Sequence, residues 1–418
     1  MKRRDFLTRS LALAGISCLP SFVSRRAGAQ TAPAGQLVFV FLRGGADPLG
    51  LAAPTGAALT RLNGFRPNLA IAGAVPFGTL ALHPRLATPL LSDAELAAHL
   101  NVVIHAGSLN ETRSHFEQMA RIEGGDMTGF PVDGILGRAA KLINRSTFAI
   151  GNAVPASLRG TNPLVLTDPA KLQAGYSAYN MKPGTAFTRS HRLGMYKLAA
   201  GEAGDTKIDA LARLAQSQFD LIDDVPVTLA QLVGQHGYLN TPFGQRLSVA
   251  GHMLASVANP AFVTVDAEHD WDTHANQRTN ELTFGAFGTK VDDIGRNLLA
   301  FKNDLVARGK WATTAVVVIT EFGRTILENA NKGSDHGRGG LILVMGGRIR
   351  PFTNTAYTGL RNWTIPTTAD ASSALDVVHD YRIVLSEILQ KNCGLTAAQA
   401  TSIFLSQINV ASSLSTVL

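Results

Sequence analysis

The 418-residue sequence has only two cysteines, Cys18 and Cys393, and no Cys-x-x-Cys pair. This scarcity excludes a disulfide scaffold, a cysteine-ligated zinc site and a thiol redox motif. No apolar run reaches the roughly 18–20 residues of a bilayer-spanning helix, which excludes a multi-span membrane protein. The G-x-S-x-G elbow, the H-E-x-x-H motif, the Walker A loop and a strand-linked G-x-G-x-x-G are also missing. The common serine hydrolase, zincin, P-loop and dinucleotide-binding classes are excluded with them.

Charge is sparse as well, and it is unevenly distributed. Charged residues make up 17% of the chain, and residues 1–29 carry +5 of the formal net charge of +7. The remaining +2 is too little for a nucleic-acid-binding surface, which needs clustered Lys and Arg on the folded body. The apolar share of 45% is ample for a large core and too high for a disordered chain.

The basic N-terminal segment predicts an export signal. A basic region that contains the pair Arg3-Arg4 is followed by a modestly apolar stretch, Leu11 to Val23, and by the small residues 27–29. The pair is similar to a twin-arginine signal, whose passengers cross the membrane already folded. We therefore expect a signal peptide over 1–29, the twin-arginine translocase as a partner during export, and a periplasmic or secreted protein. The alternative is an amphipathic basic N-terminus with no targeting role.

Five apolar segments end abruptly in glycine and polar residues, which is typical of strands buried on both faces. Stretches with helical periodicity lie between them, at about 203–236, 281–308 and 380–391. Strands that alternate with helices predict an α/β fold, a mostly parallel central sheet flanked by helices on both faces. The expected strands are Leu37–Leu42, Val102–Ile104, Phe262–Val265, Ala315–Thr320 and Leu341–Met345.

We expect one large domain over residues 30–418. Residues 48–90 and 152–200 are rich in Pro, Gly, Asn and Thr and show little periodicity. Neither region carries a core of its own, so both are interpreted as long insertions at the rim of the sheet.

Acids and histidines follow the predicted strands, where an open parallel sheet binds its ligands. Five or six oxygen and nitrogen ligands from separate loops at one sheet edge could hold one or two divalent cations. Each residue also has a structural alternative: Asp47 could be a turn acid and Glu321 the partner of Arg324. The candidate metal ligands are Asp47, Asp270, Asp272, His274, Glu321 and His336.

Two hydroxyls, on Ser114 and Thr112, are the candidate nucleophiles. Ser114 stands three residues before Glu117, the spacing of a helix capping box, so its structural alternative is an N-cap. The functional alternative places a hydroxyl at a helix N-terminus, which favours an anion such as phosphate or sulfate. His115 could bind metal or substrate, or be structural; with Arg43 and Arg324 it is a candidate substrate-binding residue.

Six sequence blocks together resemble a known family. They are Arg3–Leu7, Phe41–Asp47, Arg113–Glu117, Trp271–Gln277, Thr320–Thr325 and Ser334–Gly337. The chain is similar to a large bacterial family of twin-arginine-exported proteins catalogued as a domain of unknown function. That family is usually placed in the alkaline-phosphatase-like (sulfatase-type) superfamily. The resemblance implies that superfamily's α/β sandwich and metal-dependent hydrolysis of phosphate or sulfate esters.

The resemblance also implies roles for single residues. Asp47 resembles the superfamily's first metal-binding acid, and His336 resembles its last histidine ligand. Asp270 with His274 resembles its Asp-x-x-x-His pair, and Asp272 is the alternative acid. Glu321 falls where the hydrolases carry an Asp, and Ser114 or Thr112 falls near the nucleophile region.

One departure from the superfamily bears on function. Phe322 stands where those hydrolases follow the late acid with a histidine, which leaves room for one metal or for none. Two functions are therefore expected: a metal-dependent hydrolase or transferase of anionic esters, and a non-catalytic binding or assembly protein on the same fold. If the protein is non-catalytic, its rim insertions could recognise a glycan or a partner protein.

Overall fold

The computed structural model describes residues 35–110, 112–126, 129, 131–151, 153–161, 163–166, 169, 229–256, 258–267, 270–278, 286–349 and 363–406. The chain divides into two compact units, and the unit of Met1–Ala29 and Ala174–Asp224 lies outside these residues. The other unit, Gln30–Gln173 and Val225–Leu418, contains all of them. The predicted signal peptide, most of the 152–200 insertion and most of the helical stretch predicted at about 203–236 therefore lie outside the described residues.

An eight-stranded sheet forms the centre of the described unit, in the order β11-β5-β10-β9-β1-β8-β6-β7. All five predicted strands belong to it, and the short strands β6, β7 and β11 were not predicted. The mostly parallel α/β sheet that the apolar runs predicted is confirmed. Its strands are β1 (Gln36–Phe41), β5 (Leu100–Gly107), β6 (Thr147–Ile150), β7 (Leu164–Leu166), β8 (Phe262–Asp266), β9 (Thr314–Ile319), β10 (Gly340–Gly346) and β11 (His379–Asp380).

Strand β10 runs antiparallel to both of its neighbours, β5 and β9, whereas the other pairs in this sheet are parallel. The start of an antiparallel strand lies at the same sheet edge as the ends of the parallel strands. The loop that precedes β10, which carries His336, therefore reaches the edge where β1, β8 and β9 end.

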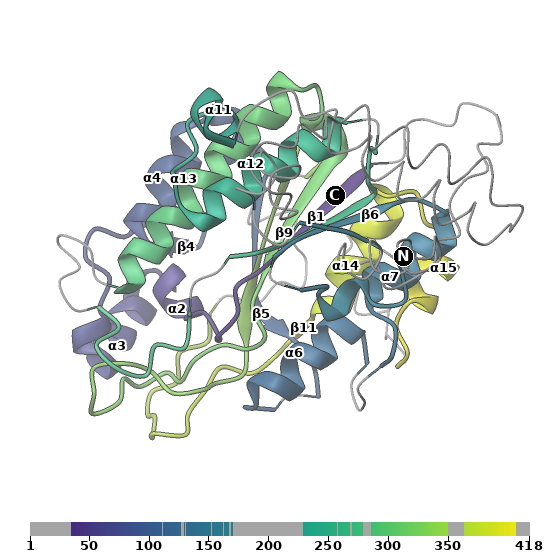
Figure 1. The fold of residues 1–418 in the computed structure, drawn as a ribbon. Coiled ribbons are helices and arrows are strands. Elements are labelled where there is room, and N and C mark those ends of the chain that lie inside the picture. The colour runs from purple at the N-terminus through teal and green to yellow at the C-terminus, as the bar shows by residue number, and fades with distance from the viewer. Residues whose placement is uncertain are drawn as a thin grey trace, which may run out of the picture. The chain divides into compact units, whose positions relative to one another are not determined.

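Helices cover both faces of the sheet, as predicted, in two separate layers (Figure 1). Alternate residues of β1 point into the two layers, Val38 and Val40 into one core and Leu37 and Phe39 into the other. One layer contains α4 (Pro84–Ser92), α11 (Leu229–Gln235), α12 (Pro242–Ala255) and α13 (Ala286–Ala307). The other contains α6 (His115–Gly124), α7 (Ile135–Ile143), α14 (Tyr381–Lys391) and α15 (Ala397–Ser402).

Residues 48–90 form short elements whose apolar side chains join the main core. Leu80 and Leu82, for example, are buried in the same cluster as Val38. A three-stranded sheet in the order β2-β4-β3 organises this region. The elements up to β5 that are not yet named are α2 (Pro48–Leu51), β2 (Ala52–Pro54), α3 (Gly56–Phe65), a 3-10 turn (Pro67–Leu69), β3 (Val75–Phe77), β4 (Leu80–Leu82) and α5 (Ala94–Ala98). Two further 3-10 turns are Ala156–Leu158 and Trp311–Thr313.

Within the part of the chain that the structure describes, no helix combines the length and apolar character that crossing a membrane requires.

Candidate metal centre

Three histidine rings and one carboxylate meet where the strands end. His115 Nε2 lies 2.9 Å from His336 Nε2, and His274 Nε2 lies 3.0 Å from the same atom. Asp272 Oδ1 lies 3.0 Å from His274 Nε2 and 3.1 Å from His336 Nε2, and its Oδ2 lies 3.3 Å from His115 Nε2. We call these four residues the His/Asp cluster. His115, Asp272 and His336 form a group whose ligand atoms all lie within 4.8 Å of one another.

Different elements deliver the four side chains. His115 is the first residue of α6, and Asp272 and His274 lie in the loop after β8. His336 lies in the connection between β9 and β10, where an isolated bridge joins it to Arg324. Gly337 makes this bridge possible, because a Cβ there would lie 2.4 Å from the carbonyl carbon of Arg324.

Each ring is oriented through its other nitrogen. His115 Nδ1 lies 2.7 Å from Glu321 Oε1, and His274 Nδ1 lies 2.9 Å from Asp335 Oδ1. His336 Nδ1 donates to the carbonyl oxygen of Arg113 over 2.8 Å. A carbonyl or an ionised carboxylate only accepts hydrogen bonds, so each Nδ1 carries a proton and each Nε2 faces the cluster. Metal-binding histidines are held in this way.

His336 Nε2 lies about 3 Å from the Nε2 atoms of both His115 and His274, and two unprotonated nitrogens at this distance repel one another unless a cation lies between them. The cation could be a proton or a metal ion. Tetrahedral Zn²⁺ with bonds of about 2.0–2.1 Å places its ligand atoms roughly 3.3 Å apart. The separations in the cluster, 2.9–3.3 Å, are close to that value. The donor set therefore fits a small divalent ion that prefers imidazole.

Asp272 is fixed as an anion. Burial alone would raise the pKa of its carboxyl, but the hydrogen bond and charge of Arg324 and the hydrogen bond of His336 bring it down to about 2. Arg324 Nη2 donates to Asp272 Oδ1 over 2.6 Å. Asp270, the other acid of the loop, is exposed, and its Oδ1 accepts from the backbone N–H of Asp272. The structure thus brings Asp272 to the cluster and leaves Asp270 supporting the turn.

Glu321 lies behind His115. Its side chain is fully buried, and Oε1 accepts from the backbone N–H of Gly44 over 2.8 Å as well as from His115. Its Oε2 accepts from Thr320 Oγ1 over 3.1 Å. The hydrogen bond and charge of Glu321 raise the pKa of His115 against the opposing effect of burial. Glu321 therefore orients a ring, and its contacts are neither those of a metal ligand nor those of a partner of Arg324.

Phe322 packs against two of the rings. Its centroid lies 4.8 Å from those of His115 and His336, with interplanar angles of 39° and 40°. A Cβ at Gly45 would lie 2.5 Å from Cε2 of this ring. Gly45 also has a φ of +67°, which glycine adopts without strain. Phe322 thus fills the space behind the imidazoles.

Asp47 and Arg324 lie in the interior, in structural contacts. Asp47 Oδ2 accepts from Arg66 Nη1 over 2.8 Å and from Gln277 Nε2 over 2.7 Å, and both members of the ion pair are buried. Arg324 is fully buried and donates to four backbone carbonyls besides Asp272. The guanidinium of Arg324 is thus enclosed by protein groups, and Asp47 lies in a buried ion pair with Arg66.

The candidate nucleophiles lie beside the cluster on the segment that leads into α6. Ser114 is exposed and stands at the N-cap position, but it makes no side-chain capping bond. Thr112 Oγ1 accepts from the backbone N–H of Ser114 over 3.3 Å. The predicted capping-box partner, Glu117, forms an ion pair with Arg121 instead. Arg43 pairs with Glu123 and Asp266, at 3.1 and 3.0 Å.

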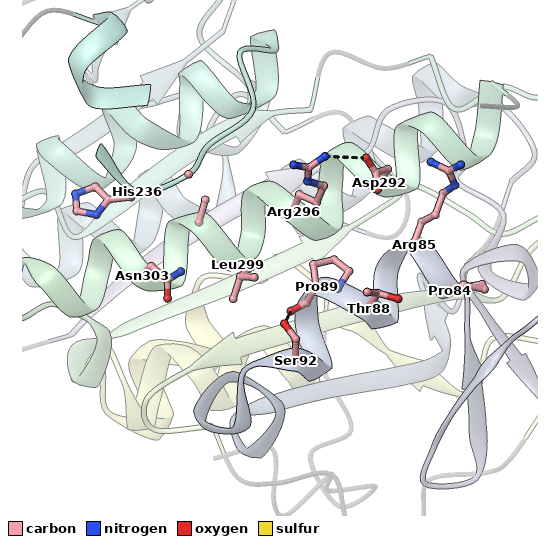
Figure 2. Close-up of a pocket in the computed structure, with 12 residues that line it drawn as sticks. Pro84, Arg85, Thr88, Pro89, Ser92, His236, Asp292, Arg296, Leu299 and Asn303 are labelled. Atoms are coloured by element: carbon pink, nitrogen blue, oxygen red, sulfur yellow. Dashed lines mark hydrogen bonds and ion pairs between the residues drawn. The ribbon is translucent and has the colours of Figure 1, made fainter. Parts of the chain in front are cut away.

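A groove of about 650 Å³ lies between α4 and α13, and none of its lining residues belongs to the cluster (Figure 2). Pro89 of α4 and the ion pair of Arg296 with Asp292, 3.7 Å long, border it. The groove has no set of converging ligand atoms like that of the His/Asp cluster, so size alone does not identify the functional site.

Sequence reasoning underestimated two residues of this centre. His115 was predicted to bind substrate or metal or to have a structural role, and its Nε2 lies 2.9 Å from that of His336. Asp335 was included only within the block Ser334–Gly337, and its carboxylate accepts a hydrogen bond from His274. The signal that could have identified His115 is its position directly after an N-cap serine, at the start of the helix that follows a buried strand.

Comparison with family models finds one match, over part of the chain. Residues 155–355 match the family model described as "Protein of unknown function (DUF1501)". No curated protein matches the chain.

Several solved structures are similar to the chain at low identity. The zinc complex of the C-terminal periplasmic domain of EcEptC from Escherichia coli is 10% identical, with a TM-score of 0.35 over 80% of this chain and 77% of that one. A protein of the alkaline phosphatase superfamily from Vibrio parahaemolyticus is 12% identical, with a TM-score of 0.35 over 84% and 71%. The alkaline phosphatase of the Antarctic bacterium TAB5 is 12% identical, with a TM-score of 0.32 over 75% and 92%. The family model matches residues 155–355, a stretch that contains three of the six sequence blocks, Trp271–Gln277, Thr320–Thr325 and Ser334–Gly337.

Proposed function

We propose that the protein is exported and binds one divalent metal ion at the His/Asp cluster, where it hydrolyses or transfers phosphate or sulfate esters. The observation that carries the metal is the set of three Nε2 atoms, each with its Nδ1 proton held by Glu321, Asp335 or the carbonyl of Arg113. Imidazole nitrogens favour Zn²⁺ or a similar transition ion over Mg²⁺ or Ca²⁺, which prefer oxygen.

The local charge supports an anionic ligand. α6 begins at His115, so the amino end of a ten-residue helix adjoins the cluster. Such an end carries partial positive charge and unpaired backbone N–H groups. A bound divalent ion would add Lewis acidity toward an ester oxygen. Asp272, held as an anion by Arg324, would balance part of that charge.

The attacking oxygen is proposed to come from Ser114, from Thr112 or from water. Ser114 is the stronger candidate of the two hydroxyls because it is exposed and makes no capping bond. A Ser114→Ala variant that loses turnover but keeps its metal would support the serine. A Thr112→Val variant is the matched control, since it removes the neighbouring hydroxyl.

The test of the whole proposal begins with metal analysis. Protein purified without chelator should contain close to one metal ion per chain, and an Asp272→Ala, His336→Ala double variant should contain none. Both proteins are then assayed on phosphate and sulfate esters with added Zn, Mn, Mg or Ca. Apoprotein with no turnover under any of these conditions would contradict the proposal.

A non-catalytic binding or assembly protein is the second candidate. Phe322 favours it, because this ring fills the space beside His115 and His336 where another ligand would be needed for a second ion. This function would be supported if the Asp272→Ala, His336→Ala double variant still captured a glycan or a partner protein.

Cell fractionation of an Arg3→Lys, Arg4→Lys variant tests the proposed twin-arginine export separately.

A further inference from the structure

We propose that His274 is an exchangeable fourth ligand, which closes the metal site at rest and is displaced by an entering phosphate or sulfate group. This inference rests on the proposed metal site and concerns how the substrate gains access to it. A metal with four protein ligands is typically structural, and a catalytic one keeps a position for water or substrate. The cluster offers four ligands, and the departure of one of them would give an ester a coordination position on a tetrahedral ion.

The geometry distinguishes His274 from the other ligands. His115, Asp272 and His336 form one compact group, and His274 approaches it from the Asp272–His336 edge. With the His274 imidazole turned toward this edge, the site has four ligands. With the imidazole turned away, the other three ligands stay in place.

Burial separates the rings in the same way. The side chain of His274 is 43% exposed, whereas those of His115 and His336 are 21% and 22% exposed. The acceptor that holds His274 is Asp335, 49% exposed, and the acceptor that holds His115 is Glu321, fully buried. An exposed pair contributes little to holding a side chain, and a buried one is costly to break.

Packing supports the same assignment. Phe322 lies against the rings of both His115 and His336, which therefore cannot rotate without displacing a buried aromatic side chain. The ring of His274 instead packs against that of His336, with 4.7 Å between the two centroids. Its backbone is nevertheless fixed, since Asn329 Nδ2 donates to its carbonyl oxygen over 2.9 Å. Turning the imidazole outward would break its exposed hydrogen bond to Asp335 and leave the backbone in place, so the ring could return to the same position.

Cobalt substitution tests this assignment, because the visible spectrum of Co²⁺ reports coordination number and ligand type. The apoprotein is titrated with Co²⁺ and then with inorganic phosphate or sulfate. We expect His274→Ala to bind Co²⁺ within about tenfold of the wild type and to bind phosphate more tightly, because no side chain competes with it. His115→Ala should weaken Co²⁺ binding by about 100-fold or more. His236→Ala, a histidine outside the cluster, is the control.

Each outcome decides between the claims. Phosphate should change the spectrum of the wild-type Co²⁺ protein, and the imidazole NMR signals of His274, not those of His115, should shift with it. Equal loss of Co²⁺ in His274→Ala and His115→Ala would overturn the exchangeable ligand and leave the metal site intact. A wild-type spectrum that phosphate does not change would also overturn it. A wild-type chain that binds neither Co²⁺ nor Zn²⁺ would overturn the proposed function itself. Circular dichroism and a second variant, His115→Gln, show whether a loss reflects unfolding.

Discussion

Replacing Glu321 by glutamine should weaken metal binding far more than replacing Asp335 by asparagine, although both carboxylates accept a hydrogen bond from a cluster histidine. Glu321 is fully buried and also accepts from the backbone N–H of Gly44, whereas Asp335 is 49% exposed. A neutral amide in place of Glu321 no longer stabilises positive charge on His115, and it can present an N–H to Nδ1 and reverse the tautomer.

The size of the difference follows from burial. Loss of such a supporting group typically lowers metal affinity 10–100-fold, which is about 1.4–2.7 kcal/mol. An exposed pair contributes about 0–1 kcal/mol, so Asp335→Asn should cost less than about fivefold. Competition for Zn²⁺ with a chromophoric chelator measures both variants, and thermal melts of the apoproteins check that each is folded. Equal affinities for the two variants, or a tighter Glu321→Gln site, would refute the orienting role given to Glu321.

Three further predictions concern stability. Burial, followed by the charges of Arg278 and Arg85, lowers the pKa of His83 to about 4. The unfolded chain therefore takes up this proton first, so stability should fall as the pH drops from about 6.5 to 4, by about 3 kcal/mol in all, and His83→Phe should lack this fall in urea titrations. Asp47→Ala leaves the buried charge of Arg66 unpaired and should cost about 3–5 kcal/mol in chemical denaturation, with metal stoichiometry unchanged. Zn²⁺ at 100 times its Kd should stabilise the wild type by about 2.7 kcal/mol, and calorimetry should show no such gain after chelation or in His115→Ala.

The sequence predicted the centre of the fold because buried strands leave a simple pattern. Leu37–Leu42 and Ala315–Thr320 are continuous apolar runs, and they became β1 and β9 within one residue at either end. The direction of β10 could not be predicted, since an apolar run has no polarity of its own. β6 (Thr147–Ile150) was not predicted, although it is a short, mostly apolar run that Gly151 follows directly.

The sequence predicted which sheet edge these side chains share, but not the contacts that each of them makes. The loops after β8 and before β10 were expected to bring Asp272, His274 and His336 to one edge, and the structure places all three there. The spacing of residues cannot show which carboxylate is already taken by an arginine. Arg66 binds Asp47, and Arg324 binds Asp272 yet leaves it facing the histidines. Such assignments depend on contacts between residues far apart in the chain.

The two histidines that lie closest together across the centre are separated by 221 positions in the chain. Nearly the whole sheet must therefore be assembled before a metal meets its full set of ligands, and contacts of such long range form late. Metal uptake would then serve as a measure of completed folding, and a fragment that stops before β10 would bind the ion no better than an unstructured peptide of the same composition.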